Sequence, residues 1–424
     1  MFNNYSDCTN FISNIPKFSK EVNLSKVSRL LDLLAPSLNS KIIHVAGTNG
    51  KGSVCKYISS ILISSEYKVG LFTSPHLVSM NERISINNEN ISEEDFVRIC
   101  NRVYEVSKKT DDLPTFFEFL FLMGMTYFCE KDTDYIVLET GIGGRLDATN
   151  SIRNKVLCVI TKIGLDHTKY LGDTIEKIAF EKAGIIKEDT PVVFWDNEDE
   201  STRVIKDVAG SKNSTCYSIN RMNIGINGMT KEIIDFHVKC GYYRYDSLIV
   251  GTCALYQIYN ASLSVLAVKA LGDERISDAS IKEGLYRSFW PGRMEKIRDN
   301  VYLDGAHNPD GIKAFLESVR VLKTEGKRYL LFAAAKDKSY DEMIDLIADS
   351  GLFDKVMAAP FDNSRSLKTY ELVKAFDRCS KLDAHVYSSV EEAYEKALLN
   401  MDPKDELFIA GSLYLAGKIR ALAD

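Results

Sequence analysis

The segment His44 to Ser53, HVAGTNGKGS, constrains the fold of this chain more than any other part of its sequence. An apolar β-type run leads into a turn that contains three glycines, and a helical pattern follows up to residue 65. Glycines let backbone N–H groups turn inward around an anion, and a helix N-terminus adds a favourable dipole. Lys51 supplies a positive charge for the β- and γ-phosphates of a nucleotide. The pattern predicts a phosphate-binding loop formed by Gly47, Thr48, Asn49, Gly50, Lys51, Gly52 and Ser53.

The loop departs from the common pattern G-x-x-x-x-G-K-[ST], because Gly52 separates Lys51 from Ser53. An ordinary tight turn between a strand and a helix would also contain glycines. A lysine placed among three glycines favours phosphate binding over that alternative. The Ser53 hydroxyl could then serve phosphate or Mg²⁺.

The rest of the chain alternates apolar β-type runs with longer helical patterns, which is typical of α/β proteins with mainly parallel strands. We therefore predict a P-loop-type sheet with helices on both faces, and a hairpin near residues 235–245 that turns at Gly241. At 424 residues the chain exceeds the usual size of a single core. The turn SFWPGR, residues 288–293, suggests the boundary. We expect an ATP-binding domain over residues 1–289 and a smaller C-terminal α/β domain over 290–424.

Composition limits the possible partners and location of the protein. The net charge of −6 comes without a basic cluster interleaved with aromatics, so a nucleic-acid partner is not expected. The nine cysteines are scattered singly, as in a reduced cytoplasmic protein, and no signal-peptide pattern precedes them. The apolar stretch 113–129 is too short for a membrane span and carries Pro114 and Glu118, so we expect a buried helix.

Several longer blocks resemble one family. GTNGKGS is similar to the Mur-ligase superfamily, and VGLFTSPHLVSMNERISINNENIS (69–92) resembles folylpolyglutamate synthases. LETGIGGRLDATN, LDHTKYLGDTIEKIAFEKAGIIK, PGRMEKI and LDGAHNPDG follow in that family's order, from about residue 40 to 310. The resemblance implies an ATP- and Mg²⁺-dependent ligase that joins L-glutamate to a folate, and to dihydropteroate in dihydrofolate synthases. It leads us to expect a monomer with small-molecule partners only.

Three residues are expected to bind Mg²⁺. Glu139 ends a β-type strand, at the sheet edge where α/β folds collect ligands, and a buried carboxylate there needs a cation. Read alone, Ser74 is a turn residue before Pro75, and His167 is more often structural than a ligand. The resemblance implies that Ser74 and Glu139 bind the Mg²⁺ of ATP and that His167 helps to hold a second Mg²⁺.

Lys182, in FEKAGIIK, would by itself be read as a solvated charge on a helix. The resemblance implies that this lysine is carbamylated by CO₂ and then faces the metals. Such a reaction requires a neutral amine, and thus a pKa lowered by burial or by nearby positive charge. Lys177 and Lys187 are competing positions, but only Lys182 aligns with the family's lysine.

Arg293, Asp304 and His307 lie near the expected start of the second domain, where the strand VYLD precedes a helix near Asp310. The resemblance implies that these residues contact ATP, with the arginine on phosphate. It also places Asn260 beside the nucleotide, although a helical asparagine is uninformative by itself. Lys51, Lys182 and His307 are the expected catalytic residues.

The site for the pterin substrate that accepts glutamate, called the acceptor site below, is expected at Thr115 and Phe117, in TFFEF, and at Asp147 and Ala148. Phe117 could stack on a pteridine ring, and Asp147 could pair with its amino-imine edge. The alternative for the aromatic residues is a simple core position.

Two other functions remain open. A UDP-muramoyl amino-acid ligase shares GTNGK, but such ligases carry a UDP-sugar domain before the loop, and the 46 residues before Gly47 are fewer than the usual domain of about 100. A non-catalytic nucleotide-binding homologue is the second alternative. The presence of Lys51, Glu139, His167, Lys182, Asp304 and His307 argues against it.

Overall fold

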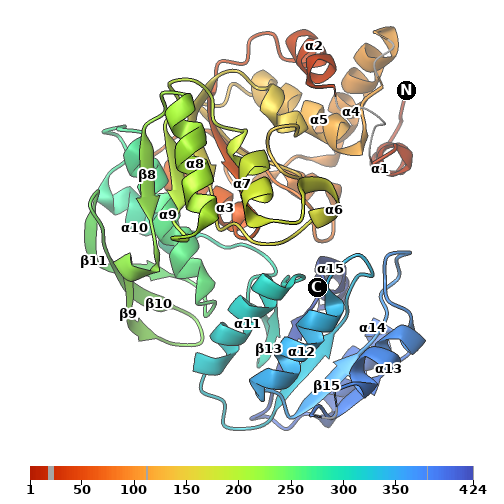
Figure 1. The fold of residues 1–424 in the computed structure, drawn as a ribbon. Helices are drawn as coiled ribbons and strands as arrows, with labels where there is room; N and C mark the ends of the chain where they lie inside the picture. Colours follow the sequence, from red (N-terminus) through yellow and green to blue (C-terminus); the bar gives the residue numbers. More distant parts are fainter. Residues whose placement is uncertain (18–22, 111–112, 380, 424) are drawn as a thin grey trace. The chain divides into compact units, whose positions relative to one another are not determined.

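The computed structural model describes residues 1–17, 23–110, 113–379 and 381–423. The chain forms two compact units (Figure 1). The first unit comprises Met1–Gly225, Phe236–Val250 and Tyr259–Ser288. The second comprises Ile226–Asp235, Gly251–Ile258 and Phe289–Asp424. Two short segments before residue 289 therefore group with the C-terminal part of the chain, and the limits 1–289 and 290–424 remain a prediction.

The first unit is built on an eight-stranded sheet of order β4-β3-β2-β5-β1-β6-β7-β8. β2, β5, β1, β6, β7 and β8 are parallel, while β3 and β4 form an antiparallel edge. Their bounds are β1 Lys41–Ala46, β2 Val69–Phe72, β3 Ile84–Ile86, β4 Glu89–Asn90, β5 Tyr135–Glu139, β6 Lys155–Ile160, β7 Val192–Trp195 and β8 Cys216–Ile219. The apolar runs predicted as strands at the start of the chain all lie in this sheet, so the mainly parallel α/β fold is confirmed.

Helices pack on both faces of this sheet. Ile42 and Ile136 belong to a core cluster with α1, α2, α4 and α5, and Ala46 and Cys158 pack with α7 and α8. α3 packs against β1, β2 and β5, and α10 packs on α3. The helices of this unit are α1 Tyr5–Asn14, α2 Leu24–Leu34, α3 Lys51–Ser64, α4 Glu93–Lys109, α5 Phe116–Glu130, α6 Thr168–Leu171, α7 Ile175–Ala183, α8 Glu200–Ser211, α9 Tyr256–Ala270 and α10 Asp278–Arg287, with 3-10 turns η1 Met80–Arg83, η2 Ala148–Ser151 and η3 Arg221–Asn223. The first three residues of α9 belong to the second unit.

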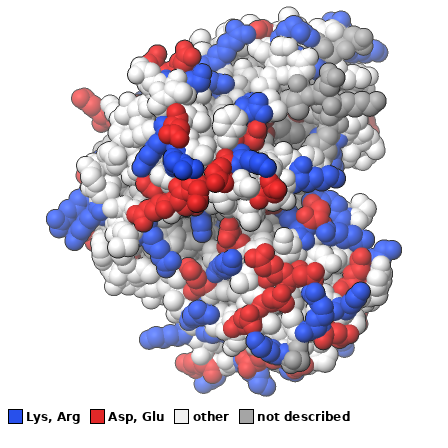
Figure 2. All heavy atoms as spheres, viewed as in Figure 1, with Lys and Arg blue, Asp and Glu red and all other residues white. Residues whose placement is uncertain are grey.

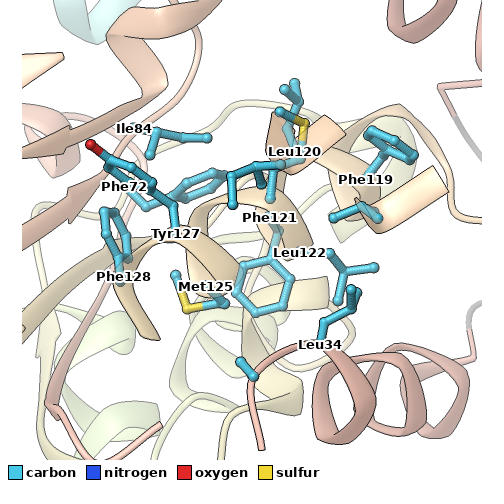
Figure 3. Close-up of a cluster of buried hydrophobic side chains, with 14 of the residues drawn as sticks. Leu34, Phe72, Ile84, Phe119, Leu120, Phe121, Leu122, Met125, Tyr127 and Phe128 are labelled. Atoms are coloured by element: carbon cyan, nitrogen blue, oxygen red, sulfur yellow. The ribbon is translucent and has the colours of Figure 1, made fainter. Parts of the chain in front are cut away.

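α5 contributes many side chains to one apolar cluster of the first unit. Figure 3 shows its aromatic side chains together with Phe72 and Ile84 of the sheet and Leu34 of α2. Each large apolar side chain buried in this way contributes roughly 1.5–3 kcal/mol. The prediction of a buried helix near residues 113–129 is confirmed. Among the described residues, no helix combines the length and the apolar character needed to cross a membrane.

A three-stranded sheet, β11-β10-β9, follows η3, where the chain passes between the units. Its strands are β9 Ile224–Met229, β10 Ile234–Lys239 and β11 Arg244–Val250. Cys240 N donates to Tyr243 O at 3.1 Å, which closes the loop that contains Gly241. The predicted hairpin is therefore confirmed at this position.

The second unit contains a six-stranded sheet of order β12-β13-β17-β14-β15-β16, parallel except for β12. Figure 1 draws it in cyan to blue. Phe315, Phe332 and Phe408 lie in its apolar core. The strands are β12 Glu295–Arg298, β13 Val301–Leu303, β14 Arg328–Phe332, β15 Lys355–Ala358, β16 Ala384–Val386 and β17 Glu406–Ala410, and the helices are α11 Pro309–Val321, α12 Tyr340–Ser350, α13 Thr369–Asp377, α14 Val390–Asn400 and α15 Leu413–Ala423. The expectation of a smaller C-terminal α/β unit is confirmed.

Candidate nucleotide and acceptor site

The glycine-rich turn lies between β1 and α3 and is held by the end of β6. Thr48 N donates to Lys162 O at 3.0 Å, and the Thr48 hydroxyl donates to Gly164 O at 3.0 Å. The Thr161 hydroxyl donates to Asn49 O at 2.7 Å. The turn is thus fixed by hydrogen bonds before any ligand binds, which lowers the ordering cost of binding.

Two of its glycines cannot be replaced without strain. Gly47 has φ +151°, and a Cβ on it would lie 1.8 Å from the Thr161 hydroxyl oxygen. Gly50 has φ +87°, and its Cβ would lie 2.4 Å from Asn260 Oδ1. The second contact also locates Asn260, whose side-chain amide lies against the turn; its contact with a nucleotide stays a prediction.

α3 begins at Lys51, directly after the turn. Its N-cap residue, Gly50, offers no side chain to accept a hydrogen bond from the first N–H groups of the helix. Lys51 Nζ donates to Thr48 O at 3.3 Å, so its ammonium lies over the turn. The Ser53 hydroxyl is buried and has no hydrogen-bond partner among the described residues. Backbone donors, one cation and a buried hydroxyl are the groups that an anion site uses, so this turn is a candidate for one.

Lys182 is not solvated, so the interpretation of a surface charge is wrong. Its side chain on α7 is 4% exposed, and Nζ donates to Gly47 O at 2.7 Å. Burial, and then the nearby ammonium of Lys51, lower the pKa of Lys182 to about 7. The competing Lys177 is exposed and pairs with Asp173 at 2.7 Å, and Lys187 is half-buried. Burial also lowers the pKa of Lys187, but Lys182 is the more deeply buried of the two and its amine contacts the turn.

Glu139 and Ser74 are neighbours at the carboxyl ends of β5 and β2. Ser74 N donates to Glu139 Oε2 at 2.8 Å, and Glu139 is 4% exposed. His167 has φ +52° at the start of α6, and its N–H donates to Asp166 Oδ1 at 2.7 Å. Within the described ranges, no three His, Cys, Asp or Glu side chains lie close enough to hold a metal ion by themselves.

Asp147 organises the loop that follows Glu139. Its carboxylate accepts hydrogen bonds from the backbone N–H groups of Gly141 and Ile142 at 3.0 and 2.9 Å, and from the N–H and hydroxyl of Thr149. Burial raises the pKa of Asp147, and these donors oppose the rise. Ala148, the next residue, is buried in the core cluster around α5. Contact of Asp147 or Ala148 with a pterin stays a prediction.

Thr115 and Phe117 lie at the start of α5. Thr115 N donates to Glu118 Oε2 at 2.7 Å, which fixes the first turn of the helix. The Phe117 ring is partly buried, packs edge-on against Phe72 at 5.9 Å, and would contact a Cβ on Gly141 at 2.8 Å. Phe117 thus contributes to the core and lies beside the loop of Asp147, so both of its expected roles remain compatible with its position.

In the second unit, Arg293, Asp304 and His307 gather at the carboxyl end of β13. Asp304 is 2% exposed and accepts from Met294 N at 3.0 Å and Ala306 N at 2.8 Å. Arg293 Nη1 donates to Gly292 O at 2.8 Å. A Cβ on Gly305 would lie 2.3 Å from Arg293 Nη1. His307 Nδ1 lies 2.8 Å from Gly305 O. The glycine at 305 therefore leaves room for the guanidinium.

Sequence reasoning missed two residues that shape these sites. Thr161 supports the turn, and its place at the end of the strand VLCVI was a usable signal. Tyr256 donates its hydroxyl to Asp304 Oδ2. No motif singles out Tyr256, because the contact joins residues 48 positions apart.

Comparison with protein families covers most of the chain. The model of the Mur ligase middle domain matches residues 45–268, and the model of the Mur ligase glutamate ligase domain matches residues 292–413. The first match includes the glycine-rich turn, Glu139 and Lys182. The second begins at the turn that contains Arg293.

Individual proteins match over nearly the full length of the chain. The dihydrofolate synthase/folylpolyglutamate synthase of Bacillus subtilis (strain 168) is 34% identical over 433 residues, covering 99% of both chains. The solved structure of E. coli FolC in complex with DHPP and ADP has a TM-score of 0.88 at 26% identity, covering 99% of this chain and 97% of that one. Mycobacterium tuberculosis folylpolyglutamate synthase complexed with ADP has a TM-score of 0.90 at 26% identity, covering 99% and 98%.

Proposed function

Because the chain belongs to the family of folylpolyglutamate synthases and dihydrofolate synthases within the Mur ligases, we propose that it adds L-glutamate to both reduced folates and dihydropteroate. The activity common to both is ATP-dependent glutamate ligation, and the chain is a ligase of this type. One observation supports the proposal most: the side-chain amines of Lys51 and of Lys182, which lies on α7, both donate to backbone carbonyls of the glycine-rich turn at residues 47–53.

A carboxylate does not form an amide in water, since its oxygen is a poor leaving group. Transfer of the γ-phosphoryl group of ATP to the acceptor's carboxylate gives an acyl phosphate, which the glutamate amine attacks with release of phosphate. Lys51 and the backbone N–H groups at the start of α3 stabilise the negative charge on the transferring phosphoryl group. Arg293 would contribute a second cation from the second unit. His307, beside Arg293, is proposed to act on the same phosphates. Catalysis then rests on positioning and electrostatics, without a protein nucleophile.

The residues present fit Mg²⁺. Glu139 provides a buried carboxylate, Ser53 a buried hydroxyl without a partner in the described chain, and Ser74 lies next to Glu139. Mg²⁺ usually takes one or two protein carboxylates and completes its shell with phosphates and water, so a cluster of three ligands is not required. We propose Ser74 and Glu139 for the Mg²⁺ of ATP and His167 for a second Mg²⁺. When bound, Mg²⁺ would neutralise charge on the transferring phosphoryl group.

We further propose that Lys182 is carbamylated in the active enzyme. The neutral amine attacks the carbon of CO₂, a C–N bond forms, and the amine loses one proton to give a carbamate anion. This step needs CO₂ and an unprotonated amine, and a pKa near 7 supplies the latter at ordinary pH. The carbamate would replace a cation with oxygen acceptors suited to a hard metal ion.

For the acceptor, we propose Thr115, Phe117, Asp147 and Ala148. Support comes from the packing of Phe117 beside Gly141, in the loop that Asp147 holds. The name of the Bacillus subtilis relative includes both activities, which supports acceptance of dihydropteroate as well as folates. Another Mur-type amino-acid ligase and a non-catalytic homologue are the alternatives that an assay must separate.

We also propose that the protein acts as a cytoplasmic monomer with small-molecule partners alone. Its nine cysteines are free thiols, as expected in a reducing compartment. Figure 2 shows acidic and basic side chains interspersed over the visible face, without a broad basic surface for nucleic acid there. Light scattering of the purified protein would test the monomer.

A product assay tests the proposed function. Purified protein is incubated with MgATP, L-glutamate and either dihydropteroate or a tetrahydrofolate, and both ADP release and the glutamylated product are measured. We expect product with both acceptors, and none when a chelator removes Mg²⁺. Product with the tetrahydrofolate alone would remove the dihydrofolate synthase activity. ADP release with a UDP-muramoyl acceptor instead, or no turnover with any acceptor, would favour one of the alternatives.

A further inference from the structure

We propose that Tyr256 is a positioning residue that holds the Asp304 carboxylate in place to accept a hydrogen bond from the bound nucleotide. The proposal rests on the proposed function, in which Asp304 contacts ATP. Tyr256 belongs to no motif of the family-like blocks, and its role follows from contacts within the second unit.

The hydrogen bonds of Asp304 are distributed unevenly over its two oxygens. Oδ2 accepts from the Tyr256 hydroxyl and from Met294 N at 3.0 Å, whereas Oδ1 accepts from Ala306 N at 2.8 Å. Each carboxylate oxygen has about two lone-pair sites. The described contacts therefore fill Oδ2 and leave one acceptor position on Oδ1. Tyr256 thus determines which oxygen is available to a ligand.

Tyr256 is itself held firmly. It packs against the apolar core of the second unit, and the preceding residue, Leu255, donates its N–H to the Ser318 hydroxyl on α11 at 3.0 Å. The segment Gly251–Ile258 belongs to the second unit by its contacts. Because this segment is already fixed, the Tyr256 side chain loses little further conformational entropy when its hydroxyl orients the Asp304 carboxylate.

Tyr256 also influences the pKa of Asp304. Burial raises the pKa of Asp304, whereas Arg293, the Tyr256 hydroxyl and the N–H groups of Ala306 and Met294 oppose that rise. Burial, Asp304 and the neighbouring Cys253 raise the pKa of Tyr256, so its hydroxyl stays a donor. A protonated Asp304 would lose an acceptor site, and loss of the tyrosine hydroxyl would bring that protonation to higher pH.

Tyr256→Phe tests the proposal, because it removes one oxygen atom and keeps the ring. We expect the Kd for MgADP, measured by titration calorimetry, and the KM for ATP to rise about three- to tenfold, as for loss of a hydrogen bond to a charged group. The KM for glutamate should stay near the wild-type value. The acid limb of the pH profile of ATP kcat/KM should shift to higher pH, which a general loosening of the structure would not produce.

Tyr394→Phe is the matched control. Its hydroxyl is buried in the same unit and has no hydrogen-bond partner among the described residues, so the change should leave nucleotide affinity and the pH profile unaltered. The melting temperature of each variant reports folding. The effect of Tyr256→Phe should largely vanish in an Asp304→Asn background, since coupled residues are not additive.

A wild-type Kd and pH profile in Tyr256→Phe would overturn the inference. The inference would also be overturned if Tyr256→Phe reduced MgADP affinity equally in the wild-type and in the Asp304→Asn background. A wild-type protein that binds MgADP but forms no glutamylated product would instead remove the proposed function, and the calorimetric comparison would still decide the role of Tyr256. If Tyr256→Phe did not fold, the same comparison is made with Asp304→Asn alone. That variant should weaken MgADP binding and lose the acid limb, and wild-type behaviour would contradict the proposal.

Discussion

Two helices, α3 and α11, each begin after the carboxyl end of a parallel strand, but their N-termini are built differently. Gly50 caps α3 and offers no side-chain acceptor. Asn308 caps α11, and its Oδ1 accepts from Gly311 N at 2.8 Å. Pro309, the first residue of α11, has no N–H at all. The first N–H groups of α3 therefore have no side-chain acceptor at the N-cap, whereas in α11 Gly311 N is occupied by Asn308 and Pro309 has no N–H to offer.

The difference bears on the nucleotide contacts proposed for each turn. The turn before α3 can bind phosphate through backbone N–H groups, the helix dipole and Lys51. For the turn before α11 the proposed contacts come from side chains instead, namely Arg293 and the fixed carboxylate of Asp304. Two similar glycine-containing patterns, GTNGKGS and DGAHNPDG, thus have different chemistry because of what caps the following helix.

Replacement of Lys51 is expected to have the largest effect on the function proposed for the turn before α3. We expect Lys51→Ala to lower kcat/KM by about 100-fold or more, as for loss of a transition-state charge contact. The melting temperature should change little, since the Lys51 side chain makes a single hydrogen bond to the described residues, to Thr48 O. Lys56→Ala, farther along α3, is the control. Near-normal turnover in a folded Lys51 variant would remove the phosphate site from this turn.

The pH dependence of activity tests Lys182, which donates to the same turn. Its pKa is lowered to about 7, so the neutral amine predominates above that pH and the ammonium below it. We expect activity to fall as pH decreases through about 7, by up to about tenfold per unit. Added bicarbonate should raise activity most near and below that pH.

Lys182→Ala should lack both the pH effect and the bicarbonate effect, and a short carboxylate added in solution should restore part of its activity. Lys177→Ala, in which an exposed lysine of the same helix is lost, is the matched control. Full activity of Lys182→Ala without any additive would contradict a role for the carbamate.

Much of the first unit could be predicted from the sequence. Strands β1, β2, β5, β6 and β7 are largely apolar runs, and the glycines around Lys51 mark the turn through local conformational needs. Burial of Lys182 could not be read locally, since its partner Gly47 O lies 135 positions away. The resemblance supplied this residue where the residue pattern suggested a surface charge.

The set of chain segments that form the second unit could not be predicted either, because it also depends on contacts between residues far apart in the sequence. Segment Ile226–Asp235 joins it through contacts such as Lys231 with the buried Glu406, whose charged groups lie 2.6 Å apart. A break at residue 289 follows from Pro291 and Gly292, which are local signals. The earlier segments depend on distant partners that no local pattern reveals.

Substitution of Gly50 tests whether the turn before α3 needs its special conformation. An alanine at φ +87° costs about 1–2 kcal/mol, and its Cβ would also displace Asn260. We expect Gly50→Ala to lower stability by about that amount. The KM for ATP should rise several-fold, because Lys51 and the N–H groups shift together. Gly351→Ala is a control for the left-handed conformation alone, since no atom lies within 4 Å of its Cβ position.

The smallest expected effect belongs to the cap of α11. Asn308→Ala removes the acceptor for Gly311 N and should cost about 1 kcal/mol of unfolding free energy, measured by denaturant titration. The KM for ATP should change far less than in Gly50→Ala, because Asn308 already occupies Gly311 N and Pro309 has no N–H to offer an anion. Asn308→Asp retains an acceptor oxygen and should keep most of the stability. If Asn308→Ala instead raised the ATP KM as much as Gly50→Ala while stability was unchanged, α11 would bind the nucleotide through its N-terminus. The contrast between the two helices would then be wrong.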